Sequence, residues 1–370
     1  MYILNTNYKQ YAKVNQYYYI LMPNKLVEWR LEMEKIKLGI VGTGMAWERL
    51  HYPALQQLTD KYEISALCNN DVTKAKNIAI KIGVDANNVF HDVSEMLETA
   101  DIDAVATMVP IDENYEVAHA VISSKKNLIA EKPFASDPNA ARELTELAKA
   151  NNVTVMVAEN FRYEEENRII KDIISQGKIG QVVYFIDNNA GDFTEDMKQN
   201  SFAAKEWRQH PKFKGGIFLD AGVHDVARMR YLFGDIDSIY ATGRPQDEEF
   251  CPYSSIHSQI KFKNGVTGQY NYFNRIKETQ APYIGLRIIG TEGEIFLESK
   301  DKSYISVSYK NGTSEQLKYS PSKGYYNELL NFYDALNGHD TIVSTPEKET
   351  DDVKVIFDIM QSIETNSIVH

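Results

Sequence analysis

Short apolar runs alternate with stretches of helical periodicity between about residue 36 and residue 160. The runs predict buried strands at 37–41, 63–68, 104–108, 127–131 and 154–158. Helices are expected in the gaps, for example over 114–123 and over 139–151, where Asp137 and Pro138 form a start signal. Strands that alternate with helices are typical of βαβ units around a parallel sheet.

After about residue 160 the pattern changes to longer alternating strands joined by turns, as at 257–262, 266–273 and 286–290. Asn-Gly pairs at 264–265 and 311–312 indicate antiparallel hairpins. Helices are predicted at 164–176, 222–232, 325–336 and 351–363. The expected fold class is α/β plus α+β. A Rossmann dinucleotide-binding domain over 35–160 precedes a domain over 161–370 that is built on a large, mostly antiparallel open sheet, and the last helix returns to the first domain.

Composition narrows the classes of partner and compartment. The 370 residues suffice for two domains, with 43% hydrophobic and 25% charged residues. A net charge of -12 without a basic stripe argues against a nucleic acid partner. Cys68 and Cys251 match no metal-ligand or redox spacing, so we expect a reducing cytoplasm and no metal site. No apolar run approaches the ~18 residues of a membrane helix, so no membrane partner is expected.

Residues 1–34 are rich in Tyr and Asn and show no signal-peptide cleavage site. We expect a poorly ordered extension. The alternative is an arm that packs on a partner subunit.

A glycine-rich turn follows the first predicted strand. Gly42 permits the turn, Gly44 lets backbone amides approach a pyrophosphate, and the helix that begins here directs its positive dipole end at that anion. Trp47 takes the place of a third glycine, so the helix is expected to shift or to pack less closely. A tight turn without a ligand is the alternative. The predicted cofactor-binding residues of this turn are Gly42, Thr43, Gly44, Met45 and Ala46.

Cofactor preference is expected to depend on the end of the second strand. An acidic residue there binds the ribose hydroxyls and repels a 2′-phosphate, but this chain has Asn69 and Asn70. Lys74, one turn later, offers positive charge. The residues therefore favour NADP slightly over NAD, with Asp71 as a competing ribose ligand and a solvated Lys74 as the plainer interpretation.

Lys132 ends a buried strand, and Pro133 prevents a helix from starting there. The carboxyl ends of parallel strands form the edge at which open α/β sheets bind ligands. Lys132 is therefore the first candidate for a reacting group.

Asp220 and His224 are four residues apart and follow the pair Gly215 and Gly216. If a helix begins near Asp220, both side chains share one face, and the carboxylate can orient the imidazole as a general base. A capping aspartate with a surface histidine is the commoner explanation of such a pair. Adjacent glycines nevertheless suggest a backbone packed closely beside a ligand.

Together these motifs resemble the glucose–fructose oxidoreductase, inositol dehydrogenase and MocA-like (Gfo/Idh/MocA) family of NAD(P)-dependent oxidoreductases. The resemblance spans about residues 35–365 and rests on the G-T-G turn, the E-K-P at 131–133, the G-G-x-x-x-D-x-G-x-H at 215–224 and the ending near 326–332. It implies that Lys132, Asp220 and His224 line the substrate pocket beside the nicotinamide.

The resemblance also implies cofactor contacts along the loop 109–114. This loop contains Pro110 and carries Asn114 where many members have histidine. Glu131 and Lys132 are expected to border the cofactor with them.

Substrate contacts are expected from the second half of the site. Trp207 and Arg208 match the W-R of the family, although Arg208 could be an ordinary ion-pairing residue. Arg162 and Tyr163 lie near the expected cleft between the domains, and pocket and domain packing are equal alternatives for them.

The implied reaction is hydride transfer between a nicotinamide and a secondary alcohol, carbonyl or anomeric carbon of a sugar, cyclic polyol or sugar derivative. We expect His224 to take the hydroxyl proton, Lys132 to hydrogen-bond the same oxygen and Asp220 to orient the cluster. Lys132 and His224 could exchange these roles.

Aromatic residues suggest further expectations about substrate and assembly. Tyr184, Trp207 and Tyr283 suit a sugar, and the family commonly forms dimers or tetramers through the second-domain sheet. The side chains expected on its exposed, pairing face are Tyr270, Tyr272 and Phe273.

Other functions fit parts of the sequence. A dinucleotide-binding regulator needs the turn but not the proton-handling residues, and an NAD-dependent glycosidase of the same family oxidises its sugar only transiently. A short-chain dehydrogenase is excluded, because Pro321 separates Tyr319 from Lys323 and that chemistry needs both on one helical turn.

Overall fold

The computed structural model describes residues 35–275, 284–298 and 302–370, together with the backbone of four earlier strands. These strands form one antiparallel sheet in chain order: β1 (Tyr2–Thr6), β2 (Lys9–Val14), β3 (Tyr17–Met22) and β4 (Lys25–Trp29). The extension expected over residues 1–34 otherwise lies outside the described residues, as does Tyr283, so both expectations stay predictions.

A six-stranded parallel sheet forms the first domain, in the spatial order β10-β9-β8-β5-β6-β7. Its strands are β5 (Ile36–Val41), β6 (Tyr62–Cys68), β7 (Val89–Phe90), β8 (Ala104–Thr107), β9 (Asn127–Glu131) and β10 (Val155–Ala158). The five predicted strands are present, and only the two-residue β7 was missed. The strand order reverses between β5 and β8, which is the switch point where doubly wound sheets bind ligands.

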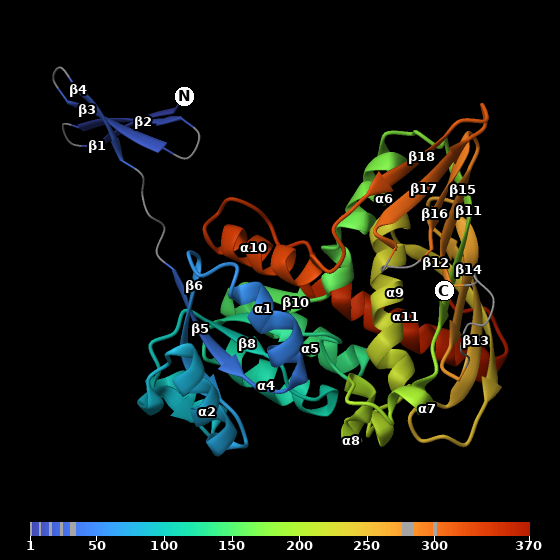
Figure 1. The fold of residues 1–370 in the computed structure, drawn as a ribbon, viewed down its shortest axis with the longest axis horizontal. Coiled ribbons are helices and arrows are strands. Elements are labelled where there is room, and N and C mark those ends of the chain that lie inside the picture. The colour runs from blue at the N-terminus through green and yellow to red at the C-terminus, as the bar shows by residue number, and fades with distance from the viewer. Residues whose placement is uncertain are drawn as a thin grey trace.

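Helices cover both faces of this sheet (Figure 1). They are η1 (Trp47–His51), α1 (Tyr52–Leu55), α2 (Val72–Ile82), η2 (Ala86–Asn88), α3 (Val93–Thr99), α4 (Ile111–Ser123) and α5 (Pro138–Asn151). Asp71, Asp92 and Asp137 cap α2, α3 and α5, each accepting a backbone N–H of the first turn. Helix α4 begins three residues earlier than predicted, because the acidic pair Asp112 and Glu113 suits a first turn.

The second domain is built on an eight-stranded sheet in the order β12-β13-β14-β11-β15-β16-β17-β18. The strands are β11 (Val182–Ala190), β12 (Ile236–Pro245), β13 (Tyr253–Phe262), β14 (Thr267–Phe273), β15 (Gly285–Gly290), β16 (Gly293–Leu297), β17 (Tyr304–Tyr309) and β18 (Ser314–Lys318). Only β11 and β14 pair in parallel. The predicted Asn-Gly turns join β13 to β14 and β17 to β18, with Gly265 and Gly312 at positive φ. The expected fold class is confirmed.

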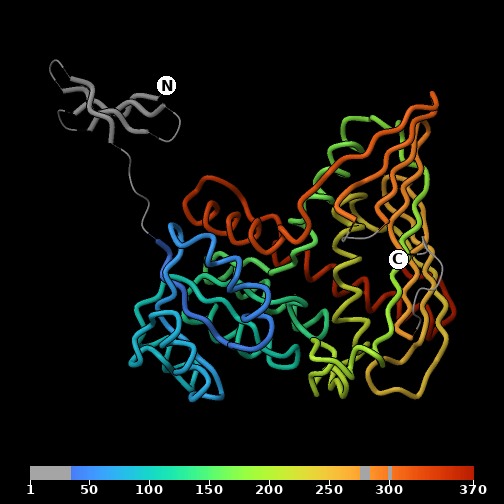
Figure 2. Tube along the Cα trace, in the orientation of Figure 1, coloured from blue at the N-terminus to red at the C-terminus, as the bar shows by residue number. Residues whose placement is uncertain are grey.

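Helices α6, α9 and α11 lie on one side of this sheet (Figure 1). The helices of this half are η3 (Asn160–Arg162), α6 (Glu165–Ser175), α7 (Phe193–Asp196), η4 (Phe202–Ala204), α8 (Glu206–Gln209), α9 (Ile217–Phe233), α10 (Gly324–Leu336) and α11 (Pro346–Thr365). The last two return to the first domain (Figure 2). Helix α10 packs on α1 and η1, and α11 packs on α5 as well as on α9 and β12.

The residues expected on an exposed pairing face are corrected by the structure. Tyr270, Tyr272 and Phe273 are buried, and the hydroxyl of Tyr270 donates to Asp225 of α9, so these rings lie inside the domain. Val183 on β11 is an exposed apolar side chain of this sheet. A homodimer or homotetramer through the sheet stays a prediction.

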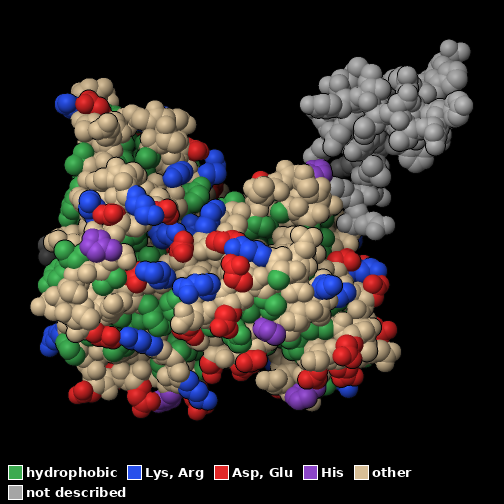
Figure 3. Space-filling model, turned by 180° about the vertical axis from the view of Figure 1, so that it is seen from behind, with side chains coloured by type: hydrophobic (Ala, Val, Ile, Leu, Met, Phe, Trp, Pro, Cys, Tyr) green, Lys and Arg blue, Asp and Glu red, His purple; other side chains and the backbone are tan. Residues whose placement is uncertain are grey.

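Charged side chains of both signs are interspersed over the face of the molecule shown in Figure 3. Within the described residues, no helix is both long and apolar enough to span a membrane.

Candidate active site

The turn after β5 requires glycine at one position and leaves open space at another. Gly42 has φ +88°, and a Cβ there would lie 2.3 Å from the carbonyl oxygen of Met108, so no other residue fits. A Cβ on Gly44 would meet no atom within 4 Å. Packing therefore does not require this second glycine, and the space beside it is where a pyrophosphate could approach the backbone.

Trp47 stands at the position of the missing third glycine and is buried. Its ring lies 4.9 Å from the ring of Tyr52, and the backbone here forms a π-helical turn, η1. The helix after the turn thus widens where a bulky residue replaces glycine, in line with the expected shift.

The end of β6 is organised by side-chain hydrogen bonds. Asn69 Nδ2 donates to Thr43 Oγ1 at 2.7 Å, and Asp71 accepts the backbone N–H of Lys74 at 2.9 Å. Asp71, Thr43 and Lys74 line an outer cavity of about 480 Å³ beside the turn, together with Lys81. Asn70 is exposed and does not line this outer cavity.

Two cavities, each of about 480 Å³, meet between the domains. The first contains residues of the cofactor turn and its surroundings: Gly44, Met45, Ala46, Pro110, Glu131, Lys205, Trp207 and Tyr325. The second extends into the other domain and contains Asn189, Asp196, Ser201, Tyr272, Phe273 and Asn274. The residues common to both are Lys132, Phe202, Arg208, Asp220 and His224. The three predicted catalytic residues therefore lie at the junction.

Asp220 holds two cations at this junction. Lys132 Nζ donates to Asp220 Oδ1 and to its backbone oxygen, both at 2.7 Å, and Arg208 Nε donates to Oδ2 at 2.5 Å. Burial alone would raise the pKa of Asp220, but the two cations hold that pKa well below its usual range. The carboxylate is thus ionised near neutral pH and holds Lys132 across the domain boundary.

Helix α9 carries Asp220 in its first turn because Gly216 allows the chain to enter at φ +52°. A Cβ on Gly216 would lie 2.0 Å from the carbonyl oxygen of Phe250, so the close approach expected from the glycine pair is present. The helix begins at Ile217, five residues before the predicted start, and Asp220 and His224 lie on it one turn apart.

The carboxylate that orients His224 is Glu159, which corrects the expectation for Asp220. His224 Nδ1 lies 2.7 Å from Glu159 Oε1, while the carboxylate of Asp220 is directed at Lys132 and Arg208. Glu159 is buried directly after β10, and burial raises its pKa to about 8. Phe161 packs its ring 4.6 Å from the imidazole and donates its backbone N–H to the same Oε1.

Asn114 does not line the cavity, so its expected nicotinamide contact is corrected. It is buried in the first turn of α4, and Nδ2 donates to the backbone oxygens of Glu131 at 3.3 Å and Pro133 at 2.9 Å. Asn114 therefore supports the end of β9 by hydrogen-bonding the backbone on both sides of Lys132. The peptide bond between Lys132 and Pro133 is cis.

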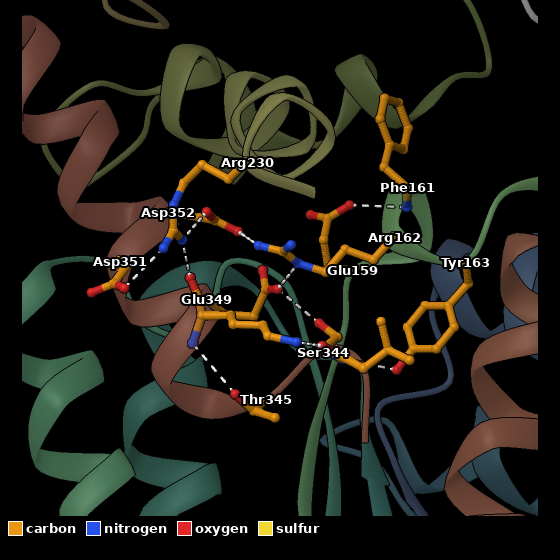
Figure 4. Close-up of polar contacts among 12 residues, drawn as sticks. Glu159, Phe161, Arg162, Tyr163, Arg230, Ser344, Thr345, Glu349, Asp351 and Asp352 are labelled. Atoms are coloured by element: carbon orange, nitrogen blue, oxygen red, sulfur yellow. Dashed lines mark hydrogen bonds and ion pairs between the residues drawn. The ribbon is translucent and has the colours of Figure 1, made fainter. Parts of the chain in front are cut away.

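Arg162 and Tyr163 are interdomain packing residues rather than pocket residues (Figure 4). Arg162 is buried and donates to Glu349 at 2.6 Å and to Asp352, both on α11. The hydroxyl of Tyr163 donates to Asn331 at 3.0 Å. Neither residue lines a cavity at the junction, so the structure favours domain packing, the other of the two alternatives, for both residues.

Several cavity residues were not expected from the sequence. Tyr325 comes from α10, and Phe202 and Lys205 come from the segment before Trp207. Glu159 could have been predicted as a site residue from the sequence, because it is a charged residue directly after a predicted strand, as Lys132 is.

Comparison with known proteins shows which family the chain belongs to. Its residues 36–159 match the model of an oxidoreductase family with an NAD-binding Rossmann fold, and residues 171–370 match the C-terminal alpha/beta domain of the same family. The chain belongs to the Gfo/Idh/MocA oxidoreductase family. As a member of this family it is an NAD(P)-dependent oxidoreductase.

Individual Gfo/Idh/MocA relatives cover most of the chain. An uncharacterised protein of Saccharomyces cerevisiae is 29% identical over 318 residues, which are 83% of this chain and 89% of the relative. The scyllo-inositol 2-dehydrogenase (NAD(+)) of Bacillus subtilis is 25% identical over 76% of this chain and 79% of its own length. The crystal structure of an oxidoreductase from Thermotoga maritima superposes with a TM-score of 0.80, at 28% identity, over 91% of this chain and 98% of the other.

The residues around the turn fit a dinucleotide. The open space beside Gly44 adjoins the start of a helix, and the cavity continues from there to Lys132. Gly44, Met45, Ala46 and Pro110 would line the bound nucleotide, and Thr43 with Asn69 would support its ribose side.

A buried acid behind the junction gives a testable stability effect. Burial, together with the negative charges of Glu131, Glu159 and Glu164, raises the pKa of Glu328 well above its ordinary 4.5. The folded carboxyl therefore keeps its proton to a higher pH than the unfolded one, which favours the unfolded state increasingly as pH rises above about 4.5. Glu328→Gln should raise the free energy of unfolding by roughly 1–2 kcal/mol at about pH 8 and by much less at about pH 5. Urea titrations measure both values, and equal gains would contradict a raised pKa of Glu328.

Proposed function

We propose that the protein transfers a hydride between NAD(P) and a secondary alcohol, carbonyl or anomeric carbon of a sugar, cyclic polyol or sugar derivative. The observation that carries this proposal is the position of Lys132, Asp220 and His224 where a cofactor-side cavity meets a second cavity. A substrate in the second cavity would place its reacting carbon beside groups that can hold and move a proton.

A polyhydroxylated substrate suits the lining of the second cavity. The amides of Asn189 and Asn274 and the hydroxyl of Ser201 offer donors and acceptors for several hydroxyl groups. The aromatic walls are formed by Phe273 and, on the cofactor side, Trp207. Tyr184 belongs to a groove on the sheet and not to this cavity. The name of the Bacillus subtilis relative, an inositol dehydrogenase, supports the same substrate class.

His224 is the proposed proton acceptor for alcohol oxidation. Because Nδ1 faces Glu159, the imidazole can present Nε2 to the substrate hydroxyl when Nδ1 carries the ring proton. The histidine gives this proton back when the enzyme reduces a carbonyl.

Lys132 is proposed to hydrogen-bond the same substrate oxygen. An ammonium has three N–H donors, and two of them are directed at Asp220, which leaves the third for the substrate. The positive charge stabilises the alkoxide that develops as the proton leaves. The bound nicotinamide supplies the hydride acceptor.

Screening of substrates tests the proposal. Aldoses, cyclic polyols and their keto or lactone forms should be offered with NAD and with NADP, and the absorbance of reduced nicotinamide followed. Stoichiometric NAD(P)H from a free sugar or polyol supports the proposal and excludes a glycosidase that recycles its cofactor. Tight dinucleotide binding without any turnover would favour a regulator instead.

We further propose that NADP binds more tightly than NAD. Asn69 has no carboxylate, and the carboxylate of Asp71 caps α2. Lys74 and Lys81 line the outer cavity. Lys74→Ala should weaken NADP binding about tenfold with little effect on NAD, because only NADP carries the 2′-phosphate. Calorimetric Kd values measure this, with Lys76→Ala as the exposed control on the same helix. Tighter binding of NAD by the unmodified protein would show the preference to be wrong.

A further inference from the structure

His51 is a buried histidine that the proposed reaction does not use. It ends the π-helical turn that follows the cofactor turn, and only 1% of its surface is exposed. Its Nε2 lies 2.6 Å from Glu131 Oε1. The ring is therefore directed at the residue that precedes Lys132.

Glu131 connects this histidine to the catalytic strand end. Its other oxygen, Oε2, accepts the backbone N–H of Lys132 at 3.0 Å. Burial alone would raise the pKa of Glu131, but the hydrogen bond and charge of His51 lower that pKa below its usual value. The ionised carboxylate thus spans from the imidazole to the backbone of Lys132.

Helix α10 holds His51 from the other side. Glu328 Oε1 lies 3.8 Å from His51 Nδ1, and the ring of Tyr325 packs edge-on at 5.2 Å. Glu328 is fully buried, and Tyr325 itself lines the cofactor-side cavity. The cofactor helix, the end of β9 and α10 therefore meet at one imidazole.

The strand end is held from two directions. Asn114 donates to the backbone oxygens of Glu131 and Pro133, while His51 holds the side chain of Glu131. Without His51, an ionised carboxylate would be left buried beside Glu328, and rotation or protonation would release it from the N–H of Lys132.

We propose that His51 is a positioning residue of the active site, which acts through Glu131 to fix the strand end from which the ammonium of Lys132 reaches Asp220. This role rests on the proposed function of Lys132. It also links the helix of the cofactor turn, through Glu131, to the catalytic lysine.

The first test uses turnover and binding. His51→Leu should lower kcat about tenfold or more while the dinucleotide Kd changes less than about threefold, as for groups that orient a reacting residue. His51→Gln, whose amide can donate to Glu131, should recover most of the loss. Thr145→Val is the matched control, because it removes a buried interdomain hydrogen bond to Thr350, and neither threonine lines a cavity at the junction.

A double-mutant cycle separates this role from general loss of stability. If His51 acts through Glu131, adding His51→Leu to Glu131→Gln should cost little beyond Glu131→Gln alone. Multiplying effects of the two substitutions would overturn the proposal.

An NMR measurement that does not depend on enzymatic activity tests the positioning role separately from the proposed reaction. In protein labelled with isotopic lysine, the NMR signal of Lys132, assigned by its loss in Lys132→Met, should shift in His51→Leu and not in Thr145→Val. An unmoved Lys132 signal would overturn the proposal. A shifted signal in a protein that oxidises no sugar or polyol would support His51 as a positioning residue and reject the proposed function alone.

Discussion

Replacing Lys132 by methionine is expected to lower kcat about a thousandfold or more while the dinucleotide Kd stays within about threefold. Methionine keeps an unbranched side chain, one atom shorter, but removes the charge and every N–H donor. The substrate oxygen then has no cation to stabilise the developing alkoxide. Steady-state kinetics with the substrate found by screening, together with calorimetric Kd values, measure the two effects.

Lys126→Met is the matched control for this substitution. Lys126 precedes the other end of β9, is partly buried and donates to the backbone oxygen of Ile102 at 2.7 Å. It lines neither cavity at the domain junction, so its loss should leave kcat nearly unchanged. Equal turnover in Lys132→Met and the unmodified enzyme would remove Lys132 from the reaction.

The second large effect is expected in the pH dependence of the His224–Glu159 pair. When Glu159 is protonated it donates to Nδ1, and a neutral imidazole then carries its own proton on Nε2 and cannot accept another. Burial raises the pKa of Glu159 to about 8. Alcohol oxidation should therefore rise as pH increases through about 8, and carbonyl reduction should fall over the same range.

Glu159→Gln should remove this step, because an amide does not titrate. It should also lower the rate of oxidation above about pH 8 by about a hundredfold, since the amide holds the useful tautomer less well. Rate profiles of kcat/KM in both directions measure the change. Glu166→Gln alters another buried glutamate, on α6 and away from the junction, and should keep the profile of the unmodified enzyme. Retention of the step in Glu159→Gln would assign it to a different group.

The parts of the site that the sequence predicted are those with local causes. The strand that ends at Glu131, the turn at Gly42 and the helix that carries Asp220 and His224 each follow from a pattern within about ten residues, because backbone sterics and hydrophobic periodicity act over that distance. The positions of these elements at one junction follow from the topology of a doubly wound sheet.

The remaining errors concern the direction and partners of side chains. Arg162 and Tyr163 were placed near the cleft correctly, but the carboxylates that attract Arg162 come from α11, far along the chain. Asn114 was expected to contact the cofactor because of the family resemblance, but its amide donates to the backbone oxygens of Glu131 and Pro133 instead. Such partners depend on tertiary packing, which local patterns do not encode.

The two buried acids of the site differ in whether the sequence alone could have identified them. Glu328 is an ordinary helix residue in the sequence, and only the packing of α10 on η1 brings it within 3.8 Å of His51. Glu159, in contrast, follows a predicted strand directly, so the argument applied to Lys132 identifies it equally well.

The central claim is that the junction of the two cavities is a site of hydride transfer to a polyhydroxylated substrate. Reduced nicotinamide should be measured by absorbance for the unmodified enzyme and for Lys132→Met, with the same sugars and cyclic polyols and with both cofactors. The account predicts one equivalent of NAD(P)H per substrate oxidised by the unmodified enzyme and almost none by the variant. No reduced nicotinamide from any substrate while the dinucleotide binds, or equal amounts from both proteins, would contradict it.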